Sequence, residues 1–137
     1  MKTAIINSDS YEKHFTGDGH PEQPKRVIAI KNKLKNRKDL IWEQPGVVPK
    51  DILNMTHSKD YIDSLKSSFP QNGLKYLDGD TVVSPDSKKA VFEAAGSTIK
   101  AIDGIENKKF KNAFCLARPP GHHAEKNKAM GFCCLSN

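Results

Sequence analysis

The chain of 137 residues contains no apolar run approaching the roughly 20 residues that a membrane-spanning helix requires. The apolar stretch near its start is too short for the core of a signal peptide, and no small-residue cleavage site follows it. Cysteine is scarce. The chain has three cysteines, Cys115, Cys133 and Cys134, and an odd number is a poor basis for a disulfide framework. No C-x-x-C pair is present to bind zinc. These absences disfavour a membrane protein, a disulfide framework and a zinc finger, and we expect a cytoplasmic protein of one domain.

The chain has a formal net charge of +6, and its most basic stretch is residues 22–39, with seven Lys or Arg. Aromatic residues are absent from this stretch. Without aromatic rings to stack on bases, this stretch provides poorly for nucleic-acid binding, which remains only a remote alternative. Val27, Ile30 and Leu34 repeat instead at helical spacing. The pattern favours a solvated helix whose apolar stripe faces the core.

Two buried strands are expected near the ends of the chain, at residues 3–7 and 112–117, with a polar loop over residues 8–21. A helix is expected from Pro21 or Pro24 to about Arg37, because proline is tolerated in a first helical turn. A strand at "LIWE" and two short helices follow, the second with Ser58 as its N-cap.

The clearest helix is expected after "SPD", with Ser84 as its cap and Pro85 in its first turn. One face of this helix carries apolar or small residues at helical spacing: Val91, Ala95, Thr98, Ile102 and Ile105. The order strand, helices, strand predicts an α/β domain with a parallel sheet.

The segment "RPPGHHA" directly follows the second buried strand, where sites gather in open parallel sheets. Its prolines stiffen the backbone, and Gly121 permits a close approach to another segment. Because two adjacent imidazoles resist double protonation, His122 and His123 would titrate as a coupled pair suited to proton transfer in hydrolysis. Taken alone, the dipeptide is also compatible with solvated loop residues, metal ligands or hydrogen-bonded structural residues.

Four segments together carry a family resemblance. They are "RPPGHHA" with the later "GFC", then "GHPEQPKRV", "THSKDYIDSL" and "LDGDTVVSPDSKKAVFEAAGSTIKAI". In this order they resemble the zinc-dependent histone deacetylase family, which includes acetylpolyamine amidohydrolases and acetoin-utilisation proteins. The last segment is similar to bacterial and class II members.

The resemblance implies an arginase/deacetylase-like three-layer α/β fold with a parallel sheet. Residues 1–137 would be the N-terminal portion of a single catalytic domain. It also implies hydrolysis of an acetylated lysine or a small acetylated amine by a zinc-activated water. The alternative is a truncated, non-catalytic chain that acts as a binding or assembly module.

By position in the motifs, His123 would be the general base and acid, and His122 its electrostatic partner. Gly131 and Phe132 would line a narrow acyl-lysine tunnel, and Asp80 would hold the substrate backbone at its rim. Arg26 would lie near an internal acetate channel.

The residues outside this set are expected to be structural. His14, His20 and His57 are expected to have structural roles, His20 and His57 as hydrogen-bonding loop residues, and Cys133 and Cys134 are expected to be small buried hydrophobes.

Zinc is implied as the cofactor, but the family's zinc ligands, an Asp-x-His segment and a further aspartate, lie beyond the matched region. We therefore predict no metal site within the chain and no activity for the 137 residues alone. We also expect them to self-associate or to require a missing C-terminal half.

Overall fold

Three parallel strands form the main sheet of the protein, whose computed structural model describes residues 2–137. Strand β1 (Thr3–Ile6) lies in the centre, between β2 (Leu40–Glu43) and β5 (Asn112–Cys115). The register places Ile5 beside Trp42 on one neighbour and Phe114 on the other. The three predicted strands and the parallel sheet are therefore confirmed.

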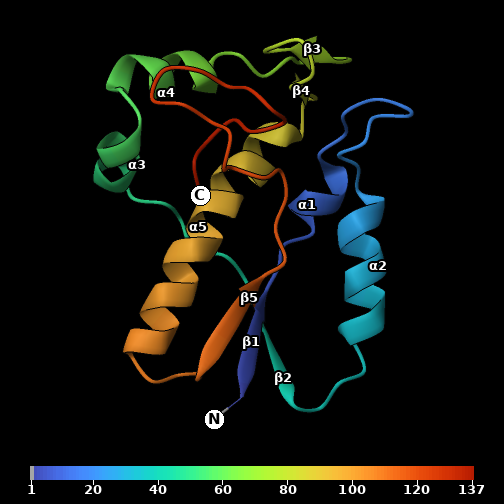
Figure 1. Cartoon of the computed structure of the whole chain (residues 1–137), viewed down its shortest axis with the longest axis vertical. Coiled ribbons are helices and arrows are strands. Elements are labelled where there is room, and N and C mark those ends of the chain that lie inside the picture. Colours follow the sequence, from blue (N-terminus) through green and yellow to red (C-terminus); the bar gives the residue numbers. More distant parts are fainter. Residues whose placement is uncertain (1) are drawn as a thin grey trace.

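Helices flank this sheet (Figure 1). The long helix α5 (Ser87–Glu106) packs along β5 and β1, and the short helix α1 (Ser10–Lys13) lies between α5 and helix α2 (Lys25–Leu34). Val27 of α2 is fully buried in a cluster with Ile5 and with residues of α5, and Ile30 and Leu34 pack against it. The predicted apolar stripe of α2 is confirmed.

The segment between β2 and α5 forms two short helices, α3 (Lys50–Thr56) and α4 (Lys59–Lys66), and a small antiparallel pair of strands. The hydroxyl of Ser58 accepts a hydrogen bond from Tyr61 N at 3.2 Å, so the predicted N-cap of α4 is confirmed. The small pair consists of β3 (Lys75–Tyr76) and β4 (Val82–Val83).

Two expectations about local structure are wrong. The predicted polar loop contains α1, because the fully buried Tyr11 anchors it through a hydrogen bond between its hydroxyl and Ser97 Oγ at 2.6 Å. Helix α5 begins at Ser87 and has no side-chain cap from Ser84. Instead Ser84 N donates to Ser87 Oγ at 2.8 Å, so a serine inside the helix supplies the hydrogen-bond acceptor for the backbone amide of Ser84.

The expected burial of β5 and of the whole apolar face of α5 is also wrong. Val91 and Ala95 are buried, but Ile102 and Ile105 at the far end of the face are 56% and 41% exposed. Phe114 on β5 is 45% exposed, because β5 is an edge strand of the sheet within residues 2–137.

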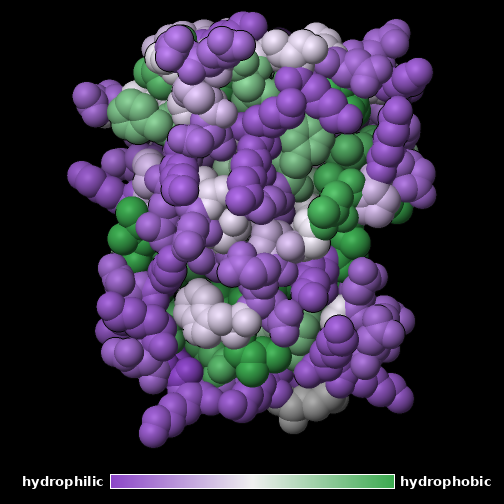
Figure 2. Space-filling view, turned by 180° about the vertical axis from the view of Figure 1, so that it is seen from behind, coloured by the Kyte–Doolittle hydropathy of each residue, from purple (hydrophilic) through white to green (hydrophobic). Residues whose placement is uncertain are grey.

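On the far side of the molecule, hydrophilic side chains cover most of the surface and apolar ones emerge in separate patches (Figure 2). Within residues 2–137, no helix combines the length and the apolar character needed to cross a membrane.

Candidate functional site

The histidine pair lies in the segment that leaves the carboxyl end of β5. The ring centroids of His122 and His123 are 4.3 Å apart, with 56° between the ring planes, and both side chains are exposed. A Cβ on Gly121 would lie 2.5 Å from the carbonyl oxygen of Leu135, so the close approach predicted for this glycine is present. The loop therefore presents two imidazoles in contact on a backbone held by its neighbours.

A buried ion pair holds the start of this loop. Arg118 is fully buried, and its Nε and Nη2 atoms donate to the two carboxylate oxygens of Glu22 at 3.1 and 2.8 Å. Its Nη1 atom donates to the carbonyl oxygens of Tyr11 and His14 at 2.7 and 2.5 Å. A charged bidentate pair with all its donors engaged fixes the loop against the segment that carries Glu22.

His14 borders this ion pair as a neutral ring. Burial, followed by the nearby Arg118 guanidinium, lowers the pKa of His14 to about 4. Its Nε2 atom is 3.8 Å from a Glu22 oxygen, but the ring is uncharged near neutral pH, so this contact is not an ion pair there. The other nitrogen, Nδ1, hydrogen-bonds to Ser87 Oγ at 2.6 Å.

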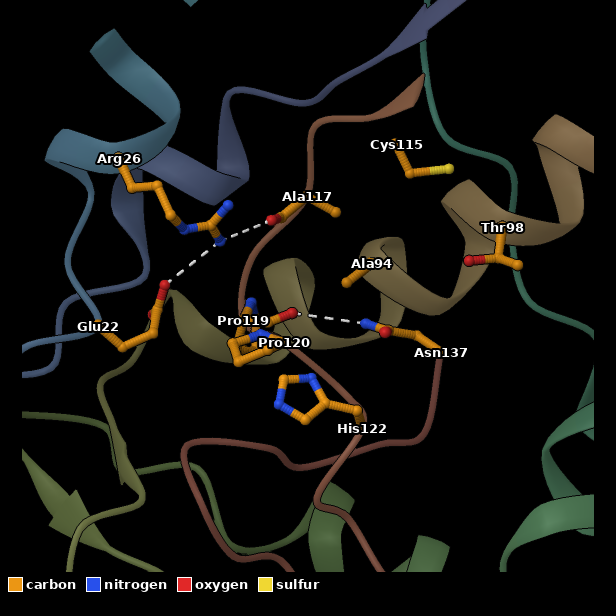
Figure 3. Close-up of a pocket in the computed structure, with 10 residues that line it drawn as sticks. All are labelled: Glu22, Arg26, Ala94, Thr98, Cys115, Ala117, Pro119, Pro120, His122 and Asn137. Carbon is orange, nitrogen blue, oxygen red and sulfur yellow. Dashed lines mark hydrogen bonds and ion pairs between the residues drawn. The ribbon is translucent and has the colours of Figure 1, made fainter. Parts of the chain in front are cut away.

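A cavity of about 390 Å³ lies beside His122 (Figure 3). Arg26 and Glu22 form one side of it, and Arg26 Nη2 donates to the carbonyl oxygen of Ala117 at 2.9 Å. Cys115 lies on another side, and burial raises the pKa of its thiol. The cavity thus combines one guanidinium with mainly apolar walls beneath the histidine loop.

Gly131 lies against His123, and Phe132 follows it in the chain; that these two residues form a channel wall stays a prediction. Both have a left-handed backbone, with φ of 57° and 72°. A Cβ on Gly131 would lie 2.7 Å from the Cβ of His123, so only glycine fits beside the imidazole. Phe132 N donates to Thr81 Oγ1 at 3.1 Å, and its ring meets the ring of His20 edge-on with centroids 4.9 Å apart.

Asp80 lies next to this wall. His20 Nε2 donates to the carbonyl oxygen of Asp80 at 2.8 Å, while His20 Nδ1 accepts from Glu22 N at 3.1 Å. The Thr81 hydroxyl donates to Asp80 Oδ1 at 3.3 Å. The structure therefore brings His20, Asp80, Thr81 and Phe132 into one connected group.

Residues just before and within the first turn of α4 hold both the loop after the histidine pair and the segment after Gly131. His57 is buried, its Nε2 atom accepts from Ser136 N at 3.0 Å, and its Nδ1 atom faces the carbonyl oxygen of Lys126 at 3.3 Å. The hydroxyl of Tyr61 donates to the carbonyl oxygen of Cys134 at 2.5 Å. His20 and His57 thus act as hydrogen-bonding groups, as expected, and His14 does so as well.

Cys133 and Cys134 are buried, which confirms their expected packing role. Cys133 Sγ accepts a weak hydrogen bond from His123 N at 3.4 Å, and burial raises the pKa of both thiols. They remain protonated near neutral pH.

The described residues, 2–137, do not fit a complete zinc site. Within residues 2–137, no group of three or more His, Cys, Asp or Glu side chains is placed to hold a metal ion. The Asp-x-His triplet formed by Asp18, Gly19 and His20 is excluded because both ring nitrogens of His20 are engaged.

Sequence reasoning missed Glu22, Arg118 and Thr81, which position the predicted residues without belonging to the predicted set. The signal was available, since all three lie inside the motifs that suggested the site. A charged or hydroxyl residue that lies among motif residues and is expected to be buried is a candidate for such positioning.

The parallel sheet, its flanking helices and the loop at its carboxyl edge define an α/β protein of arginase/deacetylase-like architecture, as predicted. The protein-family description "Histone deacetylase domain" matches residues 20–137, and the chain belongs to the histone deacetylase family.

Several known proteins are similar to this chain. An uncharacterized protein of Synechocystis sp. is 37% identical over 98% of the chain and 45% of its own length. A probable deacetylase of Archaeoglobus fulgidus is 32% identical over the whole chain and 39% of its own length. The crystal structure of the HDA15 HD domain superposes with a TM-score of 0.88 at 30% identity, covering 99% of the chain and 41% of that structure. The chain spans less than half the length of these relatives.

Proposed function

We propose that residues 1–137 are the N-terminal portion of the catalytic domain of a zinc-dependent deacylase. Its substrate would be an acetylated lysine or a small acetylated amine. One observation carries the proposal: two imidazoles in contact lie on a fixed loop, and Gly131 lies directly against His123. The three free thiols favour a reducing compartment, and we place the enzyme in the cytoplasm.

The histidines would move the protons of amide hydrolysis. His123 would take a proton from the attacking water and later give it to the leaving amine. His122, whose ring centroid lies 4.3 Å from that of His123, would be its electrostatic partner. Zinc, held by ligands outside these residues, would be the enzyme's metal and would supply Lewis-acid chemistry.

The neighbouring residues would bind the two halves of the substrate. Phe132 would contact the aliphatic stem of the acyl-lysine, and Asp80 would hold the substrate backbone at the rim. Arg26, which borders the cavity beside His122, would bind the released acetate there.

The test is His123→Ala in a form of the protein that includes the remaining catalytic domain. We expect deacetylation of an acetyl-lysine peptide to fall about 100- to 10,000-fold while zinc, measured by elemental analysis, stays bound. Lys126→Ala, an exposed change in the same loop, is the control and should keep full activity. Normal turnover in His123→Ala would remove this residue from the mechanism.

A second candidate is a non-catalytic binding or assembly module. The exposed Phe114 on the edge strand β5 favours it, because such an edge pairs readily with another chain. This alternative would be supported if a form of the protein that retains bound zinc formed a complex with a partner but showed no deacetylase activity.

A further inference from the structure

We propose that a second site on this protein, independent of the histidine pair, binds an acidic peptide segment that inserts one large apolar side chain. The site is a cavity of about 340 Å³ between the segment that leaves β2, the short helices α3 and α4, and the first half of α5. It shares no lining residue with the cavity beside His122. In Figure 1 the segment from β2 passes behind α5 to reach α3.

The cavity is preformed because its wall is held by close backbone packing. A Cβ on Gly96 would lie 1.9 Å from the carbonyl oxygen of Gly46, so the 45–48 segment rests directly on α5. Val48 and Leu53 anchor the same wall, at 8% and 5% exposure, within the core cluster. A wall held in this way keeps the cavity open without a ligand, which lowers the entropic cost of binding.

The interior of the cavity is apolar, and an apolar side chain stands at its mouth. The ring of Phe92 is half-buried against the core cluster and lines the cavity. Val47 is 90% exposed, which leaves a whole isopropyl group in water beside the opening. The volume is at the lower end of ligand pockets and accommodates one phenylalanine- or leucine-sized side chain.

The rim of the cavity is positively charged. Lys50, Lys66 and Lys89 line it, and Lys66 Nζ lies 5.8 Å from the centroid of the Phe92 ring. Within the described part of the chain, neither Lys50 nor Lys66 is within ion-pair distance of a carboxylate.

The one acidic group of the cavity is already engaged. Glu93 accepts hydrogen bonds from the hydroxyls of Ser8 and Ser10, and Lys89 Nζ lies 3.9 Å from its other oxygen. An apolar interior with unpaired ammonium groups on its rim complements an apolar side chain flanked by carboxylates. The charge pattern therefore selects an acidic peptide as the occupant.

The experiment is fluorescence anisotropy on the full chain with a labelled heptapeptide that has three acidic residues on each side of a central phenylalanine. We expect saturable binding that weakens as salt rises from 50 to 500 mM, because the rim charges are exposed. A peptide with central alanine should bind about tenfold more weakly, as expected for loss of a buried anchor. A peptide with lysines in place of the acids should not bind.

Two variants locate the site. Val47→Asp places a carboxylate at the mouth and should weaken binding at least about tenfold, and Lys50→Ala with Lys66→Ala should weaken it about fivefold and flatten its salt dependence. The control is Met55→Asp. Met55 is 81% exposed and lies on α3 outside the cavity, and this change should leave the affinity within about twofold.

Circular dichroism confirms that each variant is folded, and the high exposure of Val47 makes a folding defect unexpected. Equal affinity of Val47→Asp and the unchanged chain would overturn the proposal. So would equal binding of the alanine-centred peptide, or no binding at 1 mM peptide. Binding of a small aryl carboxylate without binding of the peptide would likewise overturn it, in favour of a small-molecule site.

Discussion

Arg118 and Glu22 are 96 positions apart in the chain, yet they form a bidentate ion pair that is almost completely shielded from water. Arg118 begins the loop with the histidine pair, and Glu22 follows the segment whose His20 contacts Phe132. The pair therefore connects the two halves of the candidate site, and its loss would act on both.

Replacing Arg118 by methionine is expected to destabilise the protein by at least about 3 kcal/mol, because Glu22 would remain as a buried charge. Arg26, at 3.5 Å and 46% exposed, is a weaker partner for it. Arg37→Met is the control. It breaks an exposed ion pair with Asp39 and should leave the unfolding free energy almost unchanged. Urea denaturation measures both, and similar losses would contradict the role assigned to the buried pair.

Thr81 is expected to orient the channel wall. Thr81→Val keeps the shape of the side chain but removes the acceptor for Phe132 N, and an unsatisfied buried donor costs about 1–3 kcal/mol. In a form with deacetylase activity, KM should rise more than kcat falls, because Phe132 would contact the substrate stem. Thr81→Ser, which retains the hydroxyl, should restore KM. An unchanged KM in the valine variant would show that Thr81 has no positioning role.

His14 should make the protein less stable as pH falls. Its pKa is about 4 in the folded protein and about 6.5 when unfolded, so between these values the unfolded state binds the additional proton. The free energy of unfolding should therefore fall, by an amount on the order of 3 kcal/mol, as pH drops from about 6.5 to 4. Urea denaturation at several pH values in this range should show a shallower dependence of the unfolding free energy on pH for His14→Gln. Asn36→Gln, an exposed change without a titratable group, should retain the slope against pH. Equal slopes for all three proteins would refute the assignment.

A chain of residues 1–137 expressed alone is expected not to retain stoichiometric zinc. A catalytic zinc needs three protein ligands, and the described residues contain no such group. Elemental analysis after extensive dialysis measures this. One tightly bound zinc per chain would reveal a site formed by other histidines and cysteines.

The same chain alone is expected to self-associate through the open edge of β5, where Phe114 is 45% exposed. Analytical ultracentrifugation should show concentration-dependent association. Phe114→Lys should reduce it, because a charge on an edge strand opposes pairing, whereas Tyr76→Lys, an exposed change away from that edge, should not. A monodisperse monomer with a cooperative thermal transition would contradict this expectation.

Local patterns predicted most of the fold correctly. A short stretch of sequence contains the information that specifies the strands, the apolar stripe of α2 and the N-cap of α4. Each of these features depends on residues only a few positions apart. The start of α5 and the existence of α1 could not be predicted in this way. Both depend on partners far along the chain, as shown by the bond between Tyr11 and Ser97.

For the candidate site, the motifs supplied candidate residues but not their arrangement. The sequence by itself determined that two histidines follow a strand on a stiff loop and that a glycine and a phenylalanine come shortly after. The tertiary structure alone decided that Gly131 touches His123 and that Thr81 holds Phe132. The physical reason is that side-chain chemistry and backbone stiffness are local properties. Contacts between distant segments form only when burial brings those segments together, and no local sequence pattern specifies which distant segments will meet.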